Sequence, residues 1–369
     1  MHTSRSSLLS LLLALAFFFL SFASAAPQNN RNGRQNNGNG NGNGNGNGGN
    51  RGGNGGNGNG NGGQTARDKA VNKTPEGVSQ AEDGSAILDT TQQINGLPIR
   101  YRISAPAQLF TAKSGVQGAQ ASPGSTGQMG INVLLHGDGG QSFFEFPNQG
   151  VRDNIMGVAV LTPDPNLKWG GSDRGNQQRP DGPEHSQAVS DLITKVMPQM
   201  VAFDNNKVDF TGVSGGSLLL TGSFMPAQMG NFPNSKVLVN CGGMAPQVQF
   251  TQGALQAMNN TRIHFQSTFN ELQSLQKSIP QAIKAYEQVA QKAGVSQQEL
   301  GQLQTVNNAP KGGHCAFDEK SFNSGIQLMA NNFGNVVLDG GNGQVGNIGD
   351  VRQSVVGNEN LQFGQEKRQ

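Results

Sequence analysis

The 369-residue sequence has only two cysteines, one tryptophan and a formal net charge of +2. Two cysteines exclude a disulfide-rich scaffold and a metal centre built from cysteine clusters. The small net charge does not provide a concentrated basic face, so we expect neither a nucleic-acid partner nor a membrane-surface partner. The chemistry therefore has to come from other side chains.

A single long apolar run is present, and it lies at the N-terminus. Residues 8–20 follow a short basic start and precede the small residues Ala23-Ser24-Ala25, which is the pattern of a secretory signal peptide. The run is shorter than the roughly 20 residues that a membrane-spanning helix requires. We therefore predict a signal peptide over residues 1–25, a secreted, extracellular protein, and no integral membrane segment after cleavage.

Glycine and asparagine dominate residues 32–63, and such a tract has no apolar side chains to bury against the entropy of ordering its backbone. We predict a disordered linker over residues 26–83. An Arg-Gly-Gly triplet at Arg51 resembles an RNA-binding repeat, but such binding needs many copies. One folded domain is expected over residues 84–345, followed by a C-terminal tail over residues 346–369.

Short apolar runs separated by helical patterns indicate an α/β fold. Residues 131–135, 158–161 and 208–210 are continuous apolar runs, which is typical of strands buried on both faces of a parallel sheet. An antiparallel hairpin is expected around Asn95-Gly96. The prediction is a mostly parallel central sheet with helices on both faces. Further strands are expected at 236–240 and 262–269, and helices at 186–200, 281–292 and 317–330.

The segment from Gly212 to Gly216 has the pattern G-x-S-x-G between an apolar strand and an apolar helix. This is the setting of a nucleophile elbow, in which glycines two residues before and after the serine permit a sharp turn. The pattern and its context predict Ser214 as a nucleophile. The alternative is a glycine-rich turn that only caps the helix.

A His-Gly loop follows the apolar strand that ends at Leu135. Acyl transfer needs backbone N–H groups aimed at the oxyanion, and the residue after the nucleophile, Gly215, supplies one. We expect the second N–H group from Asp138 or Gly139. His136 is interpreted as a residue that braces this loop and borders the bound substrate, not as the base.

The general base is expected downstream of the nucleophile if the order is serine, acid, histidine. His314 lies in a Gly-led loop that opens a helix, which suits a ring that must reach Ser214. Two other histidines fit less well, because His185 precedes the nucleophile and His264 lies inside a predicted strand.

The acid of the triad follows by elimination. No aspartate occurs between Ser214 and His314, and the acidic residues of that interval are Glu271, Glu287 and Glu299. Glu271 follows a strand, where a triad carboxylate belongs, whereas Glu287 lies on a helix. We therefore predict Glu271 as the acid, the alternative being an ordinary solvated loop glutamate.

Two covalent features are also predicted. Cys241 ends the strand after the nucleophile helix and Cys315 adjoins His314, so both should lie at one edge of the sheet and a disulfide between them is expected, with free buried thiols as the alternative. Asn259 and Asn72 begin N-x-T acceptors for glycosylation.

In these motifs the chain resembles the α/β-hydrolases, and within them the secreted esterases that include feruloyl esterases and polyhydroxybutyrate depolymerase-like proteins. The resemblance covers roughly residues 131–330. It rests on the His-Gly loop at 136–140, the elbow, and Gly312-Gly313-His314-Cys315. Residues 169–185 look like a group of fungal secreted hydrolases, some labelled cyclin-like F-box proteins, and nothing in this sequence supports that label.

The resemblance implies the α/β-hydrolase fold and a serine-dependent carboxylic ester hydrolase that needs no metal and no cofactor. Two departures prevent the carry-over of a named substrate, since Asp138 stands where cysteine is usual and the acid is a glutamate. The polar loop over residues 166–186, with Trp169, is expected to line the cleft and to favour a polar or carbohydrate-linked ester, such as one on a wall polymer or polysaccharide. The alternatives are a catalytically silent protein that binds a wall polymer or a partner, and a serine peptidase.

Overall fold

The structure is a computed structural model that describes residues 64–171 and 178–364. The predicted signal peptide and most of the predicted linker lie outside the described residues. Apolar side chains explain the centre of the fold, because every residue of strands β4 (Gly130–Leu135) and β7 (Val208–Val213) is buried. Strands that are buried on both faces belong in a parallel sheet covered on both sides.

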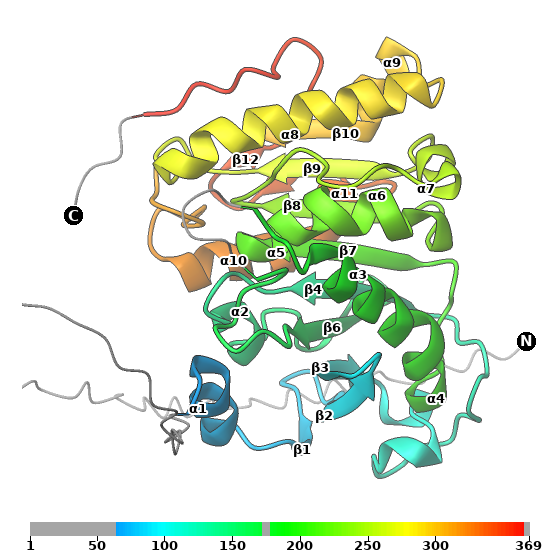
Figure 1. Cartoon of the computed structure of the whole chain (residues 1–369). Helices are drawn as coiled ribbons and strands as arrows, with labels where there is room; N and C mark the ends of the chain where they lie inside the picture. The colour runs from blue at the N-terminus through cyan, green and yellow to red at the C-terminus, as the bar shows by residue number, and fades with distance from the viewer. Residues whose placement is uncertain (1–63, 172–177, 365–369) are drawn as a thin grey trace, which may run out of the picture. The chain divides into compact units, whose positions relative to one another are not determined.

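The strand order of the main sheet is β1-β2-β3-β6-β4-β7-β8-β9-β10-β13, with β5 paired to β6. The strands from β6 to β10 in this order run parallel to one another, while the remaining strands pair antiparallel. Figure 1 shows the sheet running from β1 and β2 (blue to cyan) at one end to β9 and β10 (yellow to orange) at the other. The other strands are β1 (Gly77–Gln80), β2 (Ala86–Ile94), β3 (Leu97–Ala105), β5 (Val151–Arg152), β6 (Ile155–Leu161), β8 (Lys236–Asn240), β9 (Arg262–Gln266), β10 (Gln304–Asn307), β13 (Gln353–Ser354), and the separate pair β11 (Gln344–Val345) and β12 (Gly349–Asp350).

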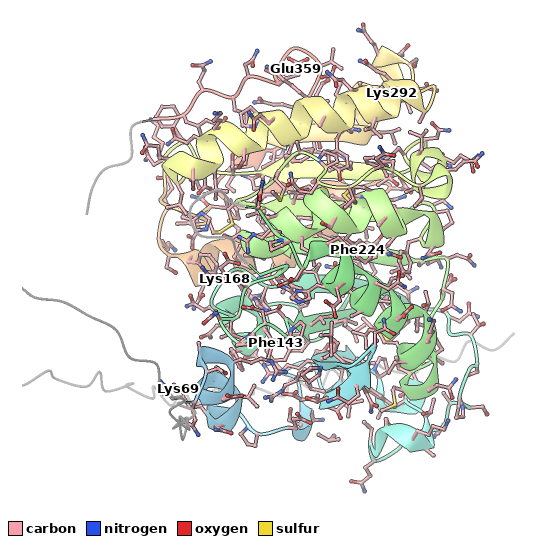
Figure 2. The ribbon with its side chains drawn as sticks, in the orientation of Figure 1. Lys69, Phe143, Lys168, Phe224, Lys292 and Glu359 are labelled. Carbon is pink, nitrogen blue, oxygen red and sulfur yellow. A yellow bond between two sulfur atoms is a disulfide. The ribbon has the colours of Figure 1, made fainter. Side chains whose placement is uncertain are left out.

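Helices cover both faces of the sheet and form two apolar cores. Val133 of β4 enters the core that contains Phe224, and its neighbour Leu134 enters the core that contains Phe143; both phenylalanines are labelled in Figure 2. Helices α3 to α9 contribute to the first core, and α2, α10 and α11 to the second. The predicted fold class, a mostly parallel sheet with helices on both faces, is confirmed.

No helix within the described ranges combines the length and the apolar character needed to cross a membrane. The α-helices are α1 (Ala66–Lys73), α2 (Gln141–Phe144), α3 (Gly182–Asp191), α4 (Met197–Met200), α5 (Gly215–Leu219), α6 (Met225–Gln228), α7 (Gln252–Ala257), α8 (Gln273–Lys292), α9 (Gln297–Leu303), α10 (Phe322–Asn331) and α11 (Phe333–Val337). Short 3-10 and π segments are η1 (Ala107–Leu109), η2 (Ala112–Ser114), η3 (Leu192–Val196), η4 (Leu220–Phe224) and η5 (Met229–Asn231).

The predicted hairpin is confirmed, and its turn explains the register of β2 and β3. Asn95 and Gly96 have φ angles of 53° and 81°, the left-handed conformation that a tight two-residue hairpin loop requires. β2 and β3 then pair along their whole length, with Ile94 opposite Leu97.

Three elements near the site differ from their predicted bounds. The strand predicted over 262–269 ends at Gln266, because the chain then leaves the sheet. The helix predicted from residue 281 begins at Gln273 and contains Pro280. Because a proline inside a helix is unfavourable, the prediction began the helix after Pro280 and missed its first two turns. The helix predicted over 317–330 begins at Phe322 after the cap at Ser321.

The folded chain extends beyond both predicted boundaries of 84–345. Before residue 84, Thr65 and Asp68 form a capping box at the start of α1, and β1 pairs with β2. After residue 345, β13 pairs with β10 and Val355 is buried. The linker and tail assignments are therefore wrong for these segments, because strands of two to four residues are too short to show a hydrophobic period and α1 has no buried side chains that would mark one of its faces.

Candidate active site

Ser214 lies in the turn between β7 and α5, and the backbone there is strained. Its φ of 49° and ψ of −111° place a non-glycine residue in an unfavourable region, a feature that clusters at functional sites. The flanking glycines are required, because a β-carbon on Gly212 would lie 2.7 Å from the Ser217 Cα and one on Gly216 would collide with the carbonyl oxygen of Leu135. The sequence pattern thus reflects close backbone packing.

The structure brings Ser214, His314 and Glu271 together at the carboxyl edge of the sheet. The Nε2 atom of His314 lies 3.0 Å from the Oγ of Ser214, and its Nδ1 atom hydrogen-bonds to Oε1 of Glu271. The Leu272 N–H donates to the same carboxylate oxygen at 2.8 Å. With Nδ1–H donating to the carboxylate, the Nε2 lone pair faces the serine hydroxyl, which is the arrangement a general base needs.

The side chains in this chain of hydrogen bonds differ in their exposure to solvent. The Glu271 side chain is fully buried and that of His314 is 20% exposed. A buried carboxylate needs partners that compensate for lost hydration; the imidazole and the Leu272 N–H both bond to Oε1, while Oε2 has no hydrogen-bond partner among the described residues. The carboxylate is therefore fixed in place while the imidazole and Ser214 can meet a substrate.

The competing histidines and glutamates lie elsewhere. His264 is buried within β9, where burial lowers its pKa to about 4. His185 accepts a hydrogen bond from the Gly170 N–H at 2.8 Å. Glu287 lies within α8 and Glu299 caps the start of α9. None of these side chains has a hydrogen bond to Ser214 in the described structure.

The backbone N–H groups of Asp138 and Gly215 are the two candidates for an oxyanion hole. The Gly139 N–H donates to the carbonyl oxygen of Leu167 at 3.0 Å, so it is already used. No acceptor among the described residues bonds to the N–H of Asp138 or Gly215. A β-carbon placed on Gly215 would lie 3.1 Å from the Asp138 nitrogen, so the two N–H groups are neighbours. The geometry favours Asp138 over Gly139.

His136 and Trp169, predicted to contact the substrate, are both fully buried, so that prediction is wrong. The Thr162 N–H donates to Nε2 of His136, whose Nδ1 then donates to the Gly137 carbonyl. Burial lowers the pKa of His136 to about 4, so the ring is neutral and braces the loop. The Trp169 ring lies between the rings of His136 and His185, at 5.4 and 6.1 Å, because burying so large an apolar surface outweighs the polar character of its loop.

Arg179 is a residue that the sequence did not single out. Its guanidinium donates to both carboxylate oxygens of Asp138, at 3.0 and 2.8 Å, and to the carbonyl oxygens of Trp169 and Gly171 at 3.1 and 3.3 Å. A bidentate pair of this kind is strong and directional. Arg179 therefore holds the oxyanion loop against the following loop, a pairing over 41 residues that no local pattern reveals.

The predicted disulfide between Cys241 and Cys315 is confirmed. It joins the end of β8 to the loop that carries His314, so this loop is tethered to the sheet. The two sulfur atoms and His314 lie close enough to hold a metal ion, but the sulfurs are bonded to each other and are not thiolate ligands. No other group with metal-ligand spacing occurs in the described part of the chain.

The two predicted glycosylation acceptors are exposed. Asn72 lies on α1 and Asn259 follows α7. Their glycosylation stays a prediction.

Comparisons with known proteins find only distant structural matches. No protein-family model and no curated protein matches the sequence. Among solved structures, a thermostable esterase is 18% identical with a TM-score of 0.41 over 60% of this chain and 54% of its own, so the match spans about half of that protein's length. An arylesterase is 9% identical (TM-score 0.40, 70% and 84% covered) and a ferulic acid esterase 13% identical (TM-score 0.40, 68% and 98% covered). At these values the neighbours do not decide the activity of this chain.

Proposed function

We propose that this chain is a serine-dependent hydrolase of carboxylic esters with Ser214 as nucleophile, His314 as general base and Glu271 as its partner. One observation carries the proposal: an unbroken chain of hydrogen bonds runs from Glu271 through His314 to Ser214, at a strained strand-to-helix turn. The order serine, acid, histidine and the turn are those of α/β-hydrolases.

The geometry accounts for each step of ester hydrolysis. The Oγ of Ser214 attacks the ester carbonyl carbon while Nε2 of His314 takes its proton, and the Glu271 carboxylate stabilises the imidazolium. The carbonyl oxygen becomes an oxyanion that the N–H groups of Asp138 and Gly215 hold. His314 gives its proton to the departing alcohol oxygen. A water molecule then attacks the acyl-enzyme with His314 again as base, and the acid leaves as Ser214 regains its proton.

Arg179 has an electrostatic task in this scheme. The Asp138 carboxylate lies beside the Gly215 backbone, and an unpaired negative charge there would oppose the developing oxyanion. The bidentate ion pair with Arg179 offsets that charge and fixes the Asp138 N–H.

We also propose that the protein acts outside the cell on a polar or carbohydrate-linked ester. The disulfide supports an oxidising compartment, and the signal pattern over residues 1–25 agrees with it. Because Trp169 is buried, its loop gives no reason for a polar substrate; the polar side chains that line a pocket between α2 and α10 support one instead.

The proposal is tested by the hydrolysis of 4-nitrophenyl acetate. The wild-type protein and Ser122→Ala, a control at an exposed serine, should turn over this ester, and Ser214→Ala should lose the activity while remaining folded. A folded wild-type protein that cleaves no ester but binds a wall polymer would favour the silent-protein alternative. A preference for peptide amides over all esters would favour a peptidase.

A further inference from the structure

A pocket of about 250 Å³ lies between α2 and α10. α2 follows directly after the oxyanion loop, and α10 begins eight residues after His314. The lining of the pocket combines the apolar side chains of Phe322 and Ile326 with the polar side chains of Ser142, Glu145 and Asn323. No sequence motif pointed to this pocket.

Phe322 connects the pocket to the catalytic residues. Its ring centroid is 5.8 Å from that of His314. A β-carbon placed on Gly137 would lie 3.4 Å from both Phe322 Cζ and Ser214 Cβ. Phe322 thus lines the pocket and also borders His314 and Gly137, so the pocket lies next to the proposed catalytic residues, on the side of the imidazole.

The position next to the imidazole decides which half of the ester fits there. The leaving oxygen must lie at Nε2 of His314, because that atom returns the proton to it. We propose that this pocket binds the alcohol half of the ester, and that this alcohol is compact, uncharged and rich in hydroxyl groups. This inference depends on the proposed function of Ser214 and His314.

The lining supplies the chemistry for such an alcohol. The Ser142 Oγ is buried and has no hydrogen-bond partner among the described residues. The Asn323 carboxamide and the Glu145 carboxylate likewise have no hydrogen bond within them, and can bond to hydroxyl groups. Phe322 and Ile326 offer an apolar surface for the carbon skeleton of a ring.

Charge and size restrict the class further. The lining contains a carboxylate, Glu145, and no lysine, arginine or histidine, so an anionic alcohol meets repulsion without a counter-charge. A volume of about 250 Å³ is below that of most drug-sized ligand sites. This volume accommodates one small polyhydroxylated ring.

The test keeps the acyl group constant and varies the alcohol. The wild-type protein should hydrolyse glucose monoacetate with a higher kcat/KM than ethyl acetate, by about tenfold, the scale of one or two net hydrogen bonds. Asn323→Ala should lower kcat/KM for glucose monoacetate about fivefold, mainly through KM, and should lower kcat/KM for ethyl acetate much less, because the ethyl group has no hydroxyl group for the carboxamide to bind. Asn260→Ala, an exposed asparagine after α7, is the matched control and should change neither.

A second variant tests the charge and does not depend on the first. Acetylglycolate, whose alcohol half carries a carboxylate, should be a poor substrate. Glu145→Gln should raise kcat/KM for acetylglycolate severalfold, because the repelling charge is removed. Glu82→Gln, at an exposed glutamate, is the control and should not change it. Equal effects of Asn323→Ala on both acetates, or no effect of Glu145→Gln, would overturn the pocket assignment alone, since ethyl acetate still reports Ser214-dependent turnover. No turnover of any acetate would overturn both proposals.

Discussion

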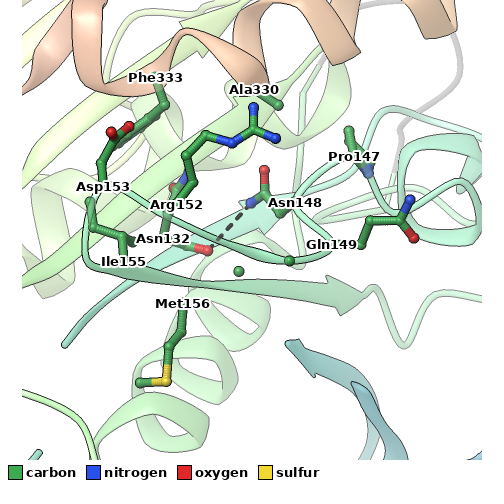
Figure 3. A pocket seen from close by; sticks show the side chains of 12 residues that line it. Asn132, Pro147, Asn148, Gln149, Arg152, Asp153, Ile155, Met156, Ala330 and Phe333 are labelled. Carbon is green, nitrogen blue, oxygen red and sulfur yellow. Dashed lines mark hydrogen bonds between the residues drawn. The ribbon is translucent and has the colours of Figure 1, made fainter. Parts of the chain in front are cut away.

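The two ends of the parallel strands use their polar groups differently. At the amino end, a cavity of about 40 Å³ lies between the starts of β4 and β6, residues 147–153, and the helices α10 and α11 (Figure 3). There the Asn148 amide donates to the Asn132 carbonyl at 3.3 Å, and Arg152 bonds to Asn331 at 2.5 Å. At the carboxyl end, the N–H groups of the proposed oxyanion hole have no acceptor among the described residues.

The difference shows why a cavity alone does not mark a site. Polar groups that satisfy each other hold structure, and a small space between them is at most room for a water molecule. Groups that stay available, at the carboxyl ends of parallel strands, are where ligands bind in such sheets. If this difference reflects function, substitutions at the carboxyl end change catalysis and those at the amino end do not.

The largest expected effect comes from the hydrogen-bond chain at the carboxyl end. His314→Ala should lower kcat about a millionfold and Glu271→Gln about ten-thousandfold, because the base or its orientation is lost. Arg152→Ala, at the amino end, should leave kcat unchanged. Steady-state kinetics with 4-nitrophenyl acetate measures all three, and comparable losses in Arg152→Ala would break the comparison.

The disulfide should matter next. The double variant Cys241→Ser, Cys315→Ser opens a loop of 74 residues and should lower the free energy of unfolding by about 4 kcal/mol on the chain-entropy estimate. Because the bridge also tethers the His314 loop, kcat should fall in the folded variant. Urea unfolding and kinetics on the same samples separate the two effects, and unchanged stability would contradict this role.

The two ends should also respond to pH in opposite directions. At the amino end, burial raises the pKa of Asp209 to about 6. The folded protein therefore holds this proton more tightly than the unfolded chain does, and it loses stability as the pH rises from about 4 to 6. At the carboxyl end, the pKa of His136 is lowered to about 4, so its contribution is lost as the pH falls from about 6.5 to 4. Each pKa shift changes the free energy of unfolding by about 3 kcal/mol across its pH range.

These opposite slopes are measured by urea unfolding across pH 4 to 6.5. The stability advantage of the wild type over Asp209→Asn should shrink as the pH rises, and its advantage over His136→Gln should grow. Parallel slopes for the two variants would show that the two buried groups are not held as described.

The smallest effect is expected from the ion pair that supports the oxyanion loop. Arg179→Met should lower kcat about ten- to a hundredfold with little change in KM, because the Asp138 N–H loses its support and the carboxylate its counter-charge. Arg152→Met is the matched control at the amino end. A change in KM alone would assign Arg179 to ground-state binding instead.

Local patterns predicted the parts of the site that depend on local geometry. The glycines around Ser214 are required by backbone contacts within a few residues, so they appear as a motif. Glu271 and His314 could be chosen because each follows a strand or a Gly-led loop in the expected chain order. The fold class followed in the same way from fully apolar runs such as that of β7.

The remainder depends on contacts between distant segments. The pairing of Arg179 with Asp138, and the approach of Phe322 to His314, join loops that the sequence treats separately. Trp169 lies in a polar loop, yet tertiary packing buries its ring completely. Strand β10 was not predicted, because four residues with the sequence QTVN carry little apolar pattern.

The position of covalent labelling by a fluorophosphonate tests the central claim most directly. Peptide mass spectrometry of the labelled wild-type protein should place the adduct on Ser214, and His314→Ala should react far more slowly. A folded wild-type protein that takes up no label, or takes it up at another serine at the same rate in Ser214→Ala, would contradict the account.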